Sequence, residues 1–224
     1  MRRIFKSLIA ISVVLSACGG GDSEERALDV FFSAVQKSDQ VAIDRVSLVP
    51  FDGSLETWEI VERGPETEGP FVLADLAAQL ESKRDEGRAK RQQNQTFIGD
   101  NRDTYTAYLA AYAEDPSAPF RGELAVFHEQ WQEKQAQLAQ LEVDADQLTF
   151  DVEALKNAAT LSLRTPVDVS FEGQIKVKPL QVRINDGSED KTYTVVLHRY
   201  ELVDTGQNRT PTPQWIIAAV QPNS

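Results

Sequence analysis

Apolar residues after position 26 follow first a helical and then a strand period. Four of them, spaced i, i+3, i+4 and i+7, predict an amphipathic helix. They are Leu28, Phe31, Phe32 and Val35. Asp39 is placed to cap a second short helix that ends near Pro50. Residues 55–61 alternate as a strand with Trp58 and Ile60 on one face, and the charged residues 62–70 predict a surface loop.

The middle of the chain, residues 71–161, has a helical pattern throughout. In its second half, apolar residues alternate at spacings of four and three, which is typical of coiled-coil packing. These seam positions are Phe120, Leu124, Phe127, Trp131, Leu138, Leu141, Ala145, Leu148, Val152, Leu155 and Ala159. A similar seam begins at Leu73 and fades through the charged residues 81–91, and Gly99 interrupts it.

Residues 114–119 contain two prolines and predict a reversal of the chain, so that the helical segments on either side run antiparallel. Two arrangements fit this pattern. In the first, residues 120–160 form one straight helix, about 60 Å long at 1.5 Å per residue. In the second, the helices break near Val143 and Asp144 and form a compact bundle of four.

The C-terminal third has strand periodicity. Val167, Val169 and Phe171 predict a strand with one buried face, and Leu180, Val182 and Ile184 fall out of phase with it across Pro179, which predicts a break or bulge. Residues 185–187 predict a turn. Residues 193–203 are apolar on both faces and predict a central strand, and residues 215–220 predict the last strand.

These patterns predict an α+β fold. N-terminal helices pack on a curved antiparallel sheet, into which a long helical hairpin or a small helical bundle is inserted. Residues 26–62 and 163–224 would form the α+β domain, and residues 63–162 the helical insertion.

The N-terminus has the pattern of an export signal. Arg2, Arg3 and Lys6 precede an apolar run over residues 8–15, which is shorter than the roughly 20 residues that span a bilayer. Leu15-Ser16-Ala17-Cys18 then resembles the lipobox of bacterial lipoproteins. This resemblance implies a signal peptide over residues 1–17, lipid attachment at Cys18 and a lipidated tether over residues 18–25. Because Gly19 stands where aspartate favours inner-membrane retention, it implies the outer membrane, facing the periplasm, in a host that has one.

Charge and cysteine content limit the remaining classes of function. Removing residues 1–17 takes away three basic residues and no acidic one, which changes the formal charge from −12 to −15. Such an acidic chain is poorly suited to bind nucleic acid. The basic residues within 83–91 alternate with acidic ones, which indicates a solvated helix face or, alternatively, contact with an acidic partner. Cys18 is the only cysteine, so no disulfide forms within the chain.

Residues suited to catalysis are scarce. His128 begins half of the helical zinc-protease motif, but Gln132 stands where the second histidine belongs. The acidic residues 186–190 lack the spacing of a calcium loop and read as a turn. The sequence therefore predicts no catalytic residue, metal site or cofactor.

Two short regions resemble the nuclear-transport-factor-two-like, or cystatin-like, fold of small bacterial lipoproteins. The resemblance rests on the Phe31-Phe32 pair, on Trp58-Glu59-Ile60 and on Gln214-Trp215-Ile216-Ile217, and covers residues 25–62 and 166–221. It implies helices packed across a curved sheet, which can leave a cone-shaped pocket. The residues expected to line such a cavity are Phe31, Trp58, His198, Tyr200 and Trp215.

Two functional hypotheses follow. The first is a non-enzymatic envelope lipoprotein, attached to the membrane through Cys18, whose helical arm binds another envelope protein or serves a structural role. The second is a small-molecule-binding protein or enzyme that uses the cavity between the helices and the sheet.

Overall fold

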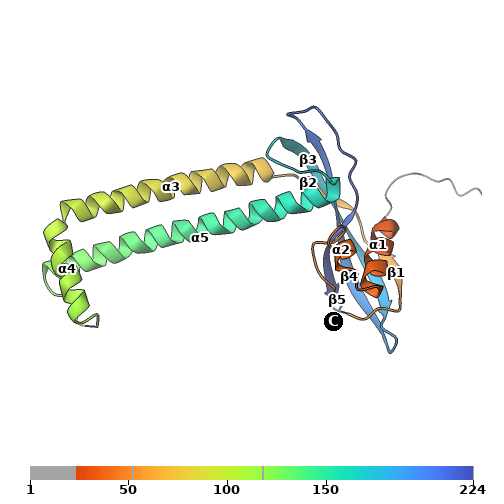
Figure 1. The fold of residues 1–224 in the computed structure, drawn as a ribbon, viewed down its shortest axis with the longest axis horizontal. Coiled ribbons are helices and arrows are strands. Elements are labelled where there is room, and N and C mark those ends of the chain that lie inside the picture. Colours follow the sequence, from red (N-terminus) through yellow and green to blue (C-terminus); the bar gives the residue numbers. More distant parts are fainter. Residues whose placement is uncertain (1–23, 52, 118, 224) are drawn as a thin grey trace, which may run out of the picture.

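The computed structural model describes residues 24–51, 53–117 and 119–223, and the predicted signal peptide and Cys18 lie outside these residues. The protein has an α+β fold in which a long helical arm projects from a domain of helices and strands (Figure 1). The helices are α1 (Glu24–Gln36), α2 (Gln40–Ile43), α3 (Leu73–Asp100), α4 (Arg102–Glu114) and α5 (Glu123–Leu163). The strands are β1 (Thr57–Arg63), β2 (Thr67–Pro70), β3 (Phe171–Asn185), β4 (Asp190–Asp204) and β5 (Ile216–Pro222).

The helical segment forms an extended antiparallel hairpin, and α5 is continuous over 41 residues, or about 60 Å. No break occurs at Val143 or Asp144, so the compact bundle of four helices is not formed. Helix α3 ends beside Gly99, α4 ends at Glu114, and the chain then turns back into α5, as the pattern predicts.

All pairings in the sheet are antiparallel, and its order is β1-β3-β4-β5, with β2 also paired to β3. Strand β4 has partners on both sides, which confirms the central position predicted for residues 193–203. Residues 62–70 are not simply a loop, because β2 pairs with Gln174–Val177 of β3. The last strand lies where it was predicted.

Pro179 does not break β3, whose pairing with β4 is continuous from Phe171 to Asn185. The change occurs in the neighbouring strands instead, since β1 pairs with β3 from Leu180 onward and β2 pairs with the part before Pro179. The carbonyl of Pro179 accepts a hydrogen bond from the Gly64 amide between these strands (2.9 Å). Proline lacks an N–H, and here the missing donor faces the gap between two edge strands.

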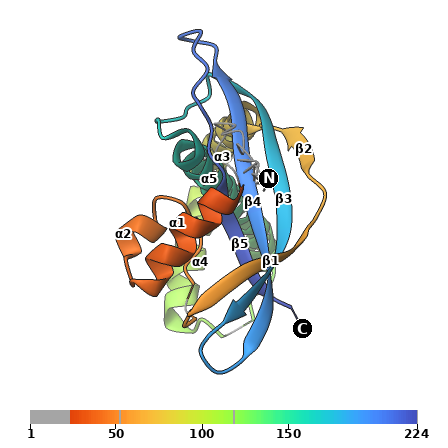
Figure 2. The same ribbon diagram turned by 90° about the vertical axis from the view of Figure 1, so that its right-hand side faces the viewer.

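The change of phase across Pro179 reflects two hydrophobic cores on opposite faces of the β3–β4 pair. Leu180, Val195 and Leu197 pack with α1 and α2 in the first core. Phe171, Tyr200 and Leu202 belong to the second, which packs against the base of α3 and the end of α5. Because successive side chains point to opposite faces of a strand, each core uses the alternate set of residues. Figure 2 shows α1 and α2 beside this pair of strands and the arm joining farther along it.

Candidate functional site

The predicted seam faces α3 along most of α5 and also contacts α4 at the tip, where it begins with Phe120 just before the helix. All eleven seam residues are buried or half-buried, whereas most of their neighbours on α5 are exposed. The seam ends at the second core, where Ala158, Ala159 and Leu163 are buried with Leu73 of α3. The α3–α5 hairpin is therefore rooted in the folded domain and its helices have a fixed register.

The seam of α3 does not fade in its charged part, as the sequence suggests, but continues with small and polar residues. Gly87 and Asn94 are buried, and Lys83 and Lys90 are half-buried, at the same alternation of three and four as Leu73 and Leu80. The side-chain amide of Asn94 donates to the carbonyl of Lys134 on α5 (3.5 Å). This middle section of the arm is consequently less apolar than its two ends.

Polar contacts join the two long helices across this section. Arg91 forms an ion pair with Glu142 (3.2 Å), and Arg84 donates to the hydroxyl of Thr149 (3.4 Å). Lys90 also donates to the side-chain oxygen of Gln137 on α5, whereas Lys83 and Arg88 form ion pairs within α3, as Arg88 does with Glu81 (3.1 Å). The cations of residues 81–91 are thus engaged within the arm, along α3 or across to α5, which favours the solvated reading of that charge run over contact with an acidic partner.

The tip of the arm is held by aromatic rings. Phe97 stacks on Phe127 with ring centroids 5.2 Å apart, and Tyr108 of α4 lies 5.5 Å from the same ring. His128 packs beside Phe120, at 4.8 Å between centroids, and its Nδ1 lies 3.4 Å from the Tyr108 hydroxyl. His128 is therefore part of a packed aromatic cluster at the tip.

The root of α5 is bonded directly to the sheet. The hydroxyl of Ser162 donates to the carbonyl of Gln214 (2.7 Å) and accepts from the amide of Tyr200 in β4 (3.2 Å). The side-chain amide of Gln214 donates to the carbonyl of Leu161, and its backbone amide to that of Ser162. The last carbonyls of a helix have no hydrogen-bond donor within the helix. Gln214 supplies donors for two of these carbonyls, those of Leu161 and Ser162.

The side of α5 that faces away from α3 carries exposed apolar residues. Val143 and Phe150, which are 62% and 69% exposed, lie seven residues apart on this side. Ala136, Ala139 and Ala154 share it and are also exposed. At 100° per residue, these positions point opposite to the seam. We call these five residues the back face of α5. Figure 1 shows that α2 lies on this side of α5, opposite α3.

The back face lies on the most acidic part of the arm. Residues 135–155 include five acidic residues and no basic one. Glu142 pairs with Arg91, whereas Asp146, which lies between Val143 and Phe150, has no charged or hydrogen-bonded partner within the described part of the chain. An exposed apolar ridge with carboxylates beside it suits a partner that combines apolar and basic side chains.

The residues expected to line a cavity are not brought together. Phe31, Trp58 and Trp215 lie in the first core, where the rings of Phe31 and Phe32 are fully buried and 5.1 Å apart. His198 and Tyr200 point to the opposite face of β4. The space between α1 and the sheet is filled by aromatic rings at this position, and because the two sets lie on opposite faces of β4, the five residues do not line one cavity.

His198 and Tyr200 have shifted pKa values because they are buried. Burial lowers the pKa of His198 and raises the pKa of Tyr200 to about 12, so both side chains are neutral near pH 7. The Nδ1 atom of His198 is buried and has no hydrogen-bond partner among residues 24–223 as far as these are described. No carboxylate forms a hydrogen bond with this ring there, so the arrangement does not resemble an acid–base pair.

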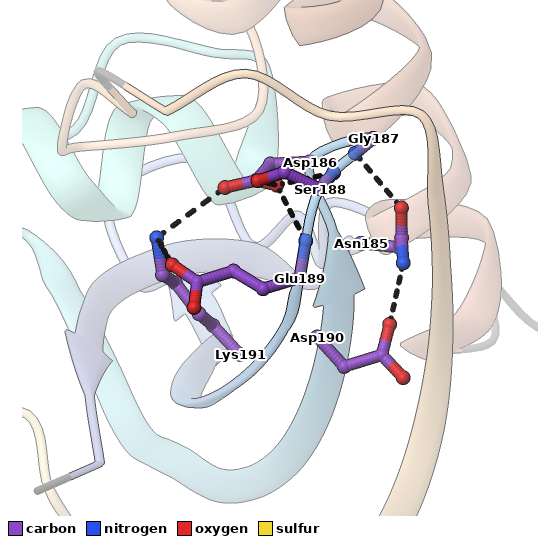
Figure 3. Close-up of polar contacts among 7 residues, drawn as sticks. All are labelled: Asn185, Asp186, Gly187, Ser188, Glu189, Asp190 and Lys191. Atoms are coloured by element: carbon purple, nitrogen blue, oxygen red, sulfur yellow. Dashed lines mark hydrogen bonds and ion pairs between the residues drawn. The ribbon is translucent and has the colours of Figure 1, made fainter.

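The acidic residues 186–190 form the turn of the β3–β4 hairpin (Figure 3). Asp186 accepts hydrogen bonds from the hydroxyl of Ser188 (2.7 Å) and from the amides of Ser188 and Glu189, and these bonds lower the pKa of its carboxyl. Lys191 forms ion pairs with Asp186 and Glu189. The carboxylates are used to hold the turn, and within the described residues no group of three or more candidate ligands could hold a metal ion.

Comparisons of the chain with protein-family models, curated proteins and solved structures find no match. Among the described helices, none is both long and apolar enough to cross a bilayer. Sequence reasoning missed the back face, although the seven-residue spacing of Val143 and Phe150 outside the seam was a signal that could have located it.

Proposed function

We propose that this chain is a membrane-anchored envelope lipoprotein that acts as a non-enzymatic interaction module and binds a partner protein along the back face of α5. One observation carries the proposal: Val143 and Phe150 are exposed on a long helix whose opposite side is already packed against α3. Large exposed apolar side chains in register on a rigid helix are typical of surfaces that receive an amphipathic segment.

The charge of this region defines the chemistry of the partner. We expect a segment, most simply a helix, that places apolar residues on Val143 and Phe150 and Lys or Arg beside Asp146. Surface ion pairs contribute about 0–1 kcal/mol each, so the apolar contacts would supply most of the affinity. The acidic surroundings would mainly raise the association rate and select the partner, in a manner that weakens with salt.

The anchor belongs to the same proposal. Lipid on Cys18, by resemblance to the lipobox, would hold the chain at the membrane, and the outer membrane is the favoured site in a host that has one. Growth with an alkyne-tagged palmitate, followed by detection on the purified chain, would test this attachment. We expect label on the natural chain and none on Cys18→Ala, and equal labelling of both would refute the anchor.

The interaction is tested by crosslinking in the host, followed by affinity capture. The variant Val143→Glu/Phe150→Glu places a better helix former at both exposed positions and removes the two large apolar side chains of the back face. The matched control is Val126→Glu, which changes another exposed valine (56%) on a different side of α5. We expect the double variant to lose a specific partner that the control retains. Undiminished capture by the double variant would contradict the proposal.

A shortened arm provides an independent test. Arg84 and Thr149 contact each other across the arm, so residues 85–148 can be replaced by a short Gly/Ser turn that joins the two helices at this level. The base of the arm, with Leu73, Ala159 and Leu163 in the second core, would remain. Circular dichroism would verify folding, and we expect the shortened chain to capture no partner.

A further inference from the structure

A cleft of about 590 Å³ lies between α2 and the end of α5. Its volume is within the range of roughly 300–1,000 Å³ that is usual for small-molecule sites. It is lined by Asp44, Arg45, Asn157, Thr160, Leu161, Arg164, Thr165 and Pro166. The cleft lies at the root of the arm and borders the second core through Leu161, which packs against that core.

Charged and apolar groups are combined in this cleft. Arg45 and Arg164 line it, and neither guanidinium has an ion pair or hydrogen bond in the described ranges of the chain. One carboxylate, that of Asp44, lies in the same cleft and accepts from the side-chain amide of Gln40 (2.7 Å). Leu161 and Pro166 add apolar surface. The cleft therefore offers two unpaired cations, one anion and an apolar wall.

Arg164 has an unusual backbone conformation for its residue type. It ends α5 in the left-handed region, at φ 53° and ψ 30°, where glycine or asparagine is usual. A side chain in this conformation is strained, and strained residues that are not glycine concentrate at functional sites. Here the strained residue also lines the cleft.

We propose that this cleft binds the free carboxylate end of an amino acid or short peptide with a small apolar side chain. Arg45 and Arg164 would receive the carboxylate, since guanidinium groups bind carboxylates through paired hydrogen bonds. Asp44 would accept from an N–H of the ligand, and the apolar side chain would contact Leu161 and Pro166. Because Asp44 would repel a dianion, the cleft favours a carboxylate over a phosphate group. This inference is independent of the partner proposed for the back face of α5.

Calorimetry with alanyl-alanine and its C-terminal amide as probes would test the site. The protein is the chain from residue 18 onward with Cys18→Ser, which keeps every described residue. We expect saturable binding of the acid and at least about tenfold weaker binding of the amide. Equal binding of acid and amide, no binding of the acid, or tighter binding of inorganic phosphate would overturn the proposal.

The variant Arg164→Gly separates the loss of the ligand contact from loss of structure. Glycine suits the left-handed conformation, so this change removes the guanidinium and relieves the backbone. We expect at least about tenfold weaker binding of alanyl-alanine with no fall in the urea midpoint. Arg45→Gln should weaken binding similarly, whereas Arg121→Gln, an exposed arginine near the tip, should not. Unchanged binding by Arg164→Gly would refute the assignment.

Discussion

Replacing Ser162 by alanine should test how firmly the arm is joined to the sheet. Ser162 is completely buried, and its hydroxyl connects Gln214 before β5 with the amide of Tyr200 in β4. Strand β5 begins with Ile216, which pairs with His198 of β4. The amide of Tyr200 therefore lies beyond β5 and donates to the hydroxyl of Ser162 instead of to a neighbouring strand.

The expected loss can be worked from these two contacts. The change removes the side-chain oxygen of Ser162 and leaves the packing otherwise similar. The buried amide of Tyr200 and the buried carbonyl of Gln214 then both lose the serine hydroxyl as a hydrogen-bond partner. Each such group costs about 1–3 kcal/mol, so we expect the free energy of unfolding to fall by about 2–4 kcal/mol. Alanine has the higher helix propensity, which offsets this by a few tenths of a kcal/mol.

Urea titration of the chain from residue 19 onward, followed by circular dichroism and tryptophan fluorescence, would measure the change. Trp58 and Trp215 report on the domain, and Trp131 on the tip of the arm. Ser82→Ala, at an exposed position of α3, is the control and should alter the free energy by less than about 0.5 kcal/mol. A loss below about 1 kcal/mol in Ser162→Ala would refute the reasoning from unsatisfied buried groups.

Three further changes test other parts of the fold. Gly173→Ala would place a Cβ 2.2 Å from the carbonyl oxygen of Glu201 at a φ of 147°, so we expect a loss of about 2 kcal/mol or more by urea titration, whereas Gly69→Ala, with no atom within 4 Å, should cost much less. In Gly87→Ala, the new Cβ in α3 would have no atom closer than 3.9 Å, so the change should stabilise the chain by about 1 kcal/mol in the same assay; a fall in stability would contradict this reasoning. Burial lowers the pKa of His198 below its ordinary 6.5, so the unfolded chain takes up a proton at a higher pH than the folded chain does. As the pH falls below about 6.5, the free energy of unfolding therefore decreases, until the folded chain is protonated as well. Urea titrations near pH 7.5 and 5.5 should therefore show a smaller loss for His198→Gln than for the natural chain, and equal losses would contradict this.

The helices and the central strand could be predicted from the sequence because their apolar residues follow a single period. The seam through Leu138 and Leu148 is an example, since it faces α3 as its spacing indicates. The middle of α3 could not be predicted in the same way, because Gly87 and Asn94 occupy buried positions without being apolar. Only a seven-residue repeat continued from Leu73 and Leu80 would have predicted that Gly87 and Asn94 are seam positions.

The candidate sites depended on contacts that the local pattern does not contain. Alternation placed His198 and Tyr200 on one face of β4, but it did not show that Phe31 and Trp215 pack against the other. The cleft depends on the approach of α2 to the end of α5, more than a hundred residues apart, and no local period reports such a contact. The shared face of Val143 and Phe150 could have been predicted from the sequence, because their seven-residue spacing places them on one side of a helix outside the seam.

The attachment of α5 to the central strand also gives the arm the properties of a lever. A rigid rod of about 60 Å, held at one end, turns a rocking of about 5° at its root into a movement of about 5 Å at its tip. Because Ser162 bonds β4 just beyond its pairing with β5, force applied at the aromatic tip is delivered to a strand that pairs with β3 along its whole length and with β5 from Tyr193 to His198. A load on the arm is thereby shared by the hydrogen bonds on both sides of β4, and shear along whole strands resists it better than peeling from an edge.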